Sequence, residues 1–195
     1  MDTLTQQLLQ QLAGGGLSQI SQQIGMDEQT TGSALSASIP LLVSALANNA
    51  SKPDGAQALH QALTNDHDGS ILNDVSGFLG NPQAANGAGI LDHVLGSQQP
   101  MVTQGLAQHT GLESGQMGQL LQIAAPLVMG ALGQQQQQQS FDPNSLSAFL
   151  GGQQQMAQQS NPDMMSTLNS LLDTNKNGTA LDEILGWLGK LFGRR

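Results

Sequence analysis

The sequence predicts an all-α protein, a helical bundle that contains an internally duplicated helical hairpin kinked at a proline. Three observations predict it. Apolar residues recur at helical spacing in several segments, glycines end most of these segments, and one apolar stretch with a central proline occurs twice. The length of 195 residues suits one medium domain, or a domain with a small appendage.

Two short helices are predicted before the repeated stretch. In residues 3–12, four leucines recur at helical spacing: Leu4, Leu8, Leu9 and Leu12. Glycines at 14–16 end this helix, and a second short segment over residues 17–24 ends at Gly25. Both segments therefore lead directly into the repeat.

The repeated stretch begins at Gly25 and again, 86 residues later, at Gly111. The copies read GMDEQTTGSALSASIPLLVSALANN and GLESGQMGQLLQIAAPLVMGALGQQ, and Pro40 aligns with Pro126. Each copy predicts a turn, an acidic first helical turn and an apolar helix. Because an interior proline removes a hydrogen bond and clashes with the preceding turn, it kinks the helix or begins a new one. We expect residues 35–47 and 121–133 to follow the same path and to pack close together.

A second pattern recurs later in the chain. Residues 66–80 align with residues 175–189, and a shorter version lies at residues 90–96. Each predicts a polar turn at a glycine, followed by a short amphipathic helix that ends at another glycine.

The Pro-centred stretch IPLLVSALANNA, with DGSILNDVSGFLG and NGTALDEILGWLG, resembles the YidB-like bacterial proteins, a family of unknown function. The resemblance covers about residues 1–133 and 161–195. It implies an all-helical fold, and it supplies no activity, cofactor or functional residue.

Composition divides the chain into three predicted parts. Residues 1–133 are the duplicated helical core domain, and residues 161–195 are a C-terminal helical module. Between them, residues 134–160 are rich in glutamine and predict a low-complexity linker or a polar helical extension. One brief helix, capped by Asp142 or Asn144, is expected within this linker.

Charge and composition exclude several classes of protein. The net charge is −9, and Lys52 is the only base before Asp173, so the clustered cations that bind nucleic acid are missing from most of the chain. There is no cysteine for disulfides or thiolate chemistry. The N-terminus lacks the basic and apolar regions of a signal peptide, and no apolar run approaches the ~20 residues of a membrane span. We expect a cytoplasmic protein for which neither nucleic acid nor a membrane is the partner.

One loop resembles the start of a calcium-binding loop. Asp173, Asn175 and Asn177 occupy the first, third and fifth positions of an EF-hand pattern. The twelfth position is Ile184 where a bidentate Glu belongs, so Asp182 or Glu183 would serve only in a shortened loop. A helix start capped by Thr179 is the favoured interpretation, and we expect no cofactor.

No catalytic motif occurs in the sequence. It has no G-x-S-x-G elbow, P-loop or GxGxxG, and its histidines are scattered: His60, His67, His93 and His109. His67, between two aspartates, is expected to be a solvated loop residue rather than a metal ligand. We predict that the chain is not an enzyme; an enzyme with a site assembled from distant residues is the remaining alternative.

The segment LDEILGWLGKLFGRR, at the C-terminus, is the most hydrophobic short helix predicted. Its candidate partner-binding residues are Ile184, Trp187, Leu188, Leu191 and Phe192. Docking on the chain's own core, association with a protein partner or a second copy, and a membrane-surface anchor are the three interpretations, in that order. The sequence predicts a non-catalytic interaction or assembly protein. The alternative is a module that responds to calcium or another metal through the Asp173 loop.

Overall fold

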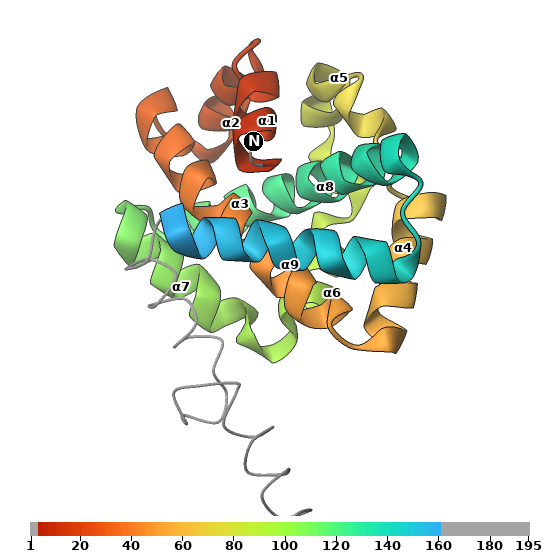
Figure 1. Ribbon diagram of the computed structural model, residues 1–195. Coiled ribbons are helices and arrows are strands. Elements are labelled where there is room, and N and C mark those ends of the chain that lie inside the picture. Colours follow the sequence, from red (N-terminus) through yellow and green to blue (C-terminus); the bar gives the residue numbers. More distant parts are fainter. Residues whose placement is uncertain (1–3, 161–195) are drawn as a thin grey trace, which may run out of the picture.

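The computed structural model describes residues 4–160, and within this range the chain forms helices and no strands (Figure 1). The α-helices are α1 (Leu4–Leu12), α2 (Gly16–Ile24), α3 (Glu28–Ala50), α4 (Pro53–Asn65), α5 (Val75–Gly80), α6 (Gly87–Leu95), α7 (Gln99–Thr110), α8 (Ser114–Gln139) and α9 (Pro143–Ser160). Short 3-10 helices lie at η1 (Ser70–Leu72), η2 (Pro82–Ala85) and η3 (Gly96–Gln98). The predicted all-α fold is confirmed.

Two long helices, α3 and α8, form the centre of the fold and pack against each other. Both are apolar on nearly every side, so they are stable only when neighbouring helices cover them. The helices α1, α2, α4, α6 and α7 each contact both α3 and α8. The core is therefore one cluster of Leu, Ile, Val, Ala and Met side chains around this central pair.

The repeated stretch has matching local structure in its two copies. Gly25 and Gly111 end the preceding helices in the left-handed region, with φ of 72° and 75°. Asp27 and Glu113 follow in extended conformations as N-caps of α3 and α8. The helices that contain the two stretches, α3 and α8, contact each other as expected; that residues 35–47 and 121–133 follow the same path, and that they arose by internal duplication, stay predictions.

Neither proline begins a new helix. Pro40 lies inside α3 and Pro126 inside α8, and each helix continues past its proline. Burial against several neighbours offsets the loss of one hydrogen bond in each case.

The structure differs from the predicted linker at residues 134–160. Residues 134–139 extend α8, and α9 packs along α3 and α4, with Leu146 and Leu150 fully buried at 0% exposure. Figure 1 shows α9 lying across the body of the fold. Glutamine is a good helix former, and its carboxamide can form hydrogen bonds with neighbouring polar groups. A Gln-rich helix can therefore pack on the core when a few leucines anchor it. Residues 134–160 are therefore not a linker; the alternative, a polar helical extension, fits residues 134–139, and α9 begins next to Asp142 as expected.

The pattern over residues 66–80 forms two short helices instead of one. After the turn at Gly69, η1 ends at Leu72, and α5 begins after Asp74. The Asp74 side chain accepts a hydrogen bond from the Gly77 N–H at 2.8 Å, and this cap starts the second helix. The related pattern at residues 175–189 lies outside the described residues, as does the predicted module at 161–195.

Within residues 4–160, α3 is long and apolar enough to cross a membrane by length and composition. In this fold, 78% of the most apolar 18-residue stretch of α3 is buried inside the protein. A core helix passes the same test, so the feature is weak evidence for a membrane span.

Substitution of either repeat glycine should destabilise the fold to a similar extent. Nothing lies within 4 Å of a Cβ added at Gly25 or Gly111, so only the positive φ opposes alanine. We expect Gly25→Ala and Gly111→Ala each to lower the free energy of unfolding by about 1–2 kcal/mol, measured by urea denaturation. Gly152→Ala in α9, also unobstructed but without positive φ, is the control and should not destabilise. Very unequal losses at 25 and 111 would contradict the structural equivalence.

Candidate functional site

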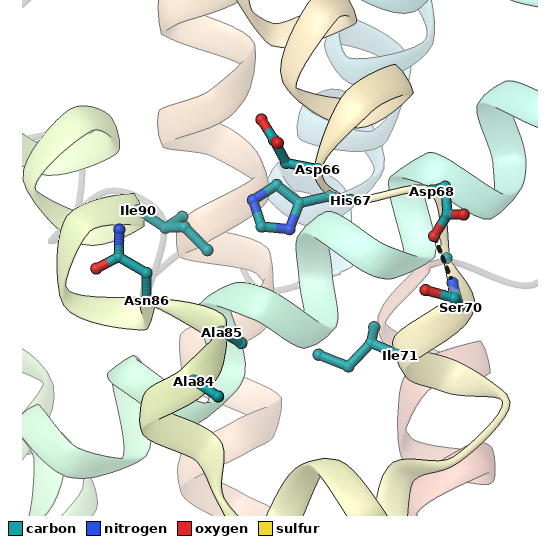
Figure 2. A pocket seen from close by; sticks show the side chains of 10 residues that line it. Asp66, His67, Asp68, Ser70, Ile71, Ala84, Ala85, Asn86 and Ile90 are labelled. Carbon is teal, nitrogen blue, oxygen red and sulfur yellow. Dashed lines mark hydrogen bonds between the residues drawn. The ribbon is translucent and has the colours of Figure 1, made fainter.

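A cleft of about 370 Å³ lies between the segment that follows α4 and the start of α6 (Figure 2). The side chains that give it chemical character are Asp66, His67, Asp68, Ser70, Asn86 and Ile90. They come from two segments that are about twenty residues apart in the sequence. Packing on α8 brings these segments together.

The first wall is the turn that ends α4. The Ala62 carbonyl accepts hydrogen bonds from the backbone N–H groups of Asp66 and His67, both at 3.0 Å. Gly69 then adopts a φ of 94°, and the Asp68 carboxylate accepts from the Ser70 N–H at 2.9 Å. These bonds turn the chain sharply and leave the side chains of His67 and Ser70 at the cleft.

This first wall rests directly on the backbone of α8. A Cβ at Gly133 would overlap the carbonyl oxygen of His67, and a Cβ at Gly130 would overlap the Ile71 side chain. The Ile71 side chain and the His67 backbone therefore occupy the space that side chains would take at these two positions. The position of the imidazole depends on this close approach.

The second wall is also held against α8 through a glycine. Asn86 adopts a φ of 51° and caps α6, its side-chain oxygen accepting from the Gly89 N–H at 3.3 Å. A Cβ at Gly87 would overlap the carbonyl oxygen of Gln122. That carbonyl has no partner four residues on, because Pro126 has no N–H. Pro126 thus leaves this carbonyl free of a helical donor near the start of α6, and Gly87 allows α6 to pack against it.

His67 is the titratable group at the centre of this cleft. Figure 2 shows its ring directed from the α4 side toward Asn86 and Ile90. The residue is half-buried, whereas the sequence analysis expects a solvated loop histidine. Burial lowers the pKa of His67 below its ordinary value, and the nearby Asp66 carboxylate opposes this shift. A lowered pKa favours the neutral ring at pH 7, which has one donor and one acceptor nitrogen.

The carboxylates of the cleft are more exposed than His67. The pKa of Asp68 lies below its ordinary value because Ser70 donates hydrogen bonds to it. No three His, Asp or Glu side chains within residues 4–160 converge as metal ligands would. The cleft thus presents an imidazole, a carboxamide and two carboxylates as hydrogen-bonding groups.

The residues predicted from the sequence as sites lie elsewhere. The possible cation ligands Asp173, Asn175, Asn177, Asp182 and Glu183 fall outside the described residues, and so do the five candidate partner-binding residues. Of the other histidines, His60 has its Nε2 at 2.9 Å from the Phe141 carbonyl oxygen, and His93 and His109 are exposed. The structure does not bring the four histidines together at one cleft.

The comparison with known families identifies a match over most of this body. Bacterial proteins of unknown function, designated DUF937, match residues 6–135. The chain belongs to this family. The resemblance to YidB-like proteins is consistent with it. The matched range includes both walls of the cleft and nearly all of α8, and it ends before α9. No curated protein and no solved structure matches the chain.

An alanine at Gly133 should disturb both the cleft and the stability of the fold. Its Cβ would meet the His67 backbone, which cannot move as a flexible side chain does. We expect Gly133→Ala to lower the free energy of unfolding by about 1–3 kcal/mol. Gly118→Ala on the same helix is the matched control, because its Cβ would meet only Thr103 Cγ2 at 3.9 Å, and it should be neutral or stabilising. Equal urea midpoints for the two variants would contradict the proposed contact.

The lowered pKa of His67 predicts a pH dependence of stability. The unfolded chain binds a proton at this residue more readily than the folded protein, so the free energy of unfolding falls as pH drops below about 6.5. We expect His67→Asn to lose less stability than the wild type between about pH 7.5 and 5.5, in urea titrations at each pH. Parallel pH profiles would show that burial does not suppress protonation of His67.

Proposed function

We propose that this protein is a non-catalytic interaction or assembly protein, and that apolar side chains near its C-terminus make the contact. The observation that carries this proposal is that residues 4–160 bury nearly all of their large hydrophobic side chains. Within residues 4–160, Met101 is the large hydrophobic side chain left exposed, at 52%. The other large apolar residues in that range are buried or partly buried against the core.

The C-terminal sequence has many apolar side chains that need a surface. Six of the nine residues from 184 to 192 are large and apolar: Ile184, Leu185, Trp187, Leu188, Leu191 and Phe192. In a helix they would surround the axis, so one core could not cover them all. Fully burying one such side chain contributes about 1.5–3 kcal/mol. Among the large hydrophobic side chains of residues 4–160, only Met101 is exposed, which favours a contact outside the same chain.

Charge complementarity favours a second copy as that partner. Residues 4–160 contain nine carboxylates and one base, Lys52. By contrast, Lys176, Lys190, Arg194 and Arg195 lie within the last 23 residues. A cationic terminal segment from one copy would therefore meet an acidic body on another. Trp187 is the proposed anchor, since buried tryptophans are enriched among residues that dominate binding energy.

Self-association should depend on Trp187 and not on Met101. We expect the average sedimentation coefficient of the full-length protein to rise with concentration, and Trp187→Glu to remove this rise because it places a charge in an apolar contact. Met101→Glu is the matched control and should associate as the wild type does. Circular dichroism of each variant checks that the fold is retained.

Two results would contradict the proposal. One is a full-length protein that remains monomeric over the whole concentration range. The other is association that survives Trp187→Glu, which would place the contact on another surface. Loss of association in Met101→Glu alone would assign the contact to α7.

A further inference from the structure

A second cleft, of about 610 Å³, lies between the end of α2, the segment from α5 to α6, and α8. It shares Asn86 with the first cleft. Six carboxamide side chains line it: Gln23, Asn81, Gln83, Asn86, Gln119 and Gln122. Its volume lies within the roughly 300–1,000 Å³ of small-molecule sites.

The lining of this cleft has no ionisable side chain. Apolar residues also line it: Ile24, Leu79, Pro82, Ala88 and Ile123. A charged ligand would leave water here without meeting an opposite charge, which is costly. A purely apolar ligand would cover the carboxamides and leave them without hydrogen-bond partners, which is also costly.

Most of these carboxamides are available for a ligand. Gln23 donates to the Leu79 carbonyl, and the Asn86 oxygen accepts from the Gly89 N–H. The other four are exposed and make no side-chain hydrogen bond to another residue of the described range: Asn81, Gln83, Gln119 and Gln122. Each carboxamide has an NH₂ group with two donors and a carbonyl oxygen that accepts.

The backbone adds donors at one edge of the cleft. Gly87 and Ala88 line it and form the first turn of α6, a helix of nine residues. N–H groups in a first helical turn have no partner within their own helix. The cleft therefore presents neutral donors and acceptors side by side, with apolar surface between them.

We propose that this cleft binds an uncharged, hydroxyl-rich ligand of the sugar class. A hydroxyl group donates and accepts at once, so neighbouring hydroxyls match neighbouring carboxamides. The C–H faces of a sugar ring match the apolar residues that line the same cleft. This inference does not depend on the proposed C-terminal contact.

Isothermal titration of the full-length protein with a small panel of sugars tests the ligand class. The neutral probes are glucose, maltose and N-acetylglucosamine, and their charged counterparts are glucosamine and glucuronate. We expect at least one neutral sugar to bind, and to bind more tightly than the charged sugars. Absence of binding by all three neutral sugars, or tighter binding of a charged one, would overturn the proposal.

Paired substitutions on α8 test the location. Gln119 and Gln122 are exposed, so leucine at both removes the carboxamides without opening the core. We expect the Gln119→Leu/Gln122→Leu variant to bind the sugar about tenfold more weakly or worse. Gln104→Leu, at an exposed position of α7 outside the cleft, is the control and should leave affinity unchanged. Unchanged affinity in the double variant would also overturn the assignment.

Discussion

Close backbone contact with α8 determines where its neighbours lie. Helices usually keep their axes apart by the width of their side chains. On α8, the segment that follows α4 instead reaches the backbone at Gly130 and Gly133, and α6 approaches the Gln122 carbonyl through Gly87. Both clefts have walls made of these segments. Their shapes are thus set by three glycines and by one carbonyl that Pro126 leaves without a helical donor.

The same contacts distinguish α8 from α3, although the sequences of the two helices align. The positions that align with Gly130 and Gly133 are Ser44 and Ala47, which carry side chains and are buried. A neighbour cannot reach the α3 backbone there as His67 reaches Gly133. The Ser44 hydroxyl is buried without a hydrogen-bond partner among the described residues. The two helices therefore differ at these positions, and the loop that carries His67 can pack closely only against α8.

Local signals in the sequence were enough for the helices but not for the clefts. Gly25 and Gly111 were recognisable because a glycine before an acidic first turn marks a helix boundary within a few residues. The packing of α9 is not predicted from composition, because the two leucines that anchor it, Leu146 and Leu150, lie in a glutamine-rich segment. The clefts were missed because they depend on glycine contacts between distant segments. The Asp-His-Asp-Gly sequence at 66–69 was the one local signal for the first cleft, and burial of its histidine follows from tertiary packing.

Carboxamides replace ion pairs in much of this body. Gln11 donates to the Leu72 carbonyl at 3.0 Å, Gln116 to the Ile24 carbonyl at 3.1 Å, and Gln136 to the Thr64 hydroxyl at 2.8 Å. These neutral bonds join segments distant in sequence, and salt screens them far less than it screens surface charges. The carboxylates of Asp27 and Asp74 instead cap their own helices, each accepting a hydrogen bond from a backbone N–H three residues later. The hydrogen bonds that join these distant segments therefore do not depend on ion pairs. If copies associate as proposed, salt should affect that association more than it affects the stability of the fold.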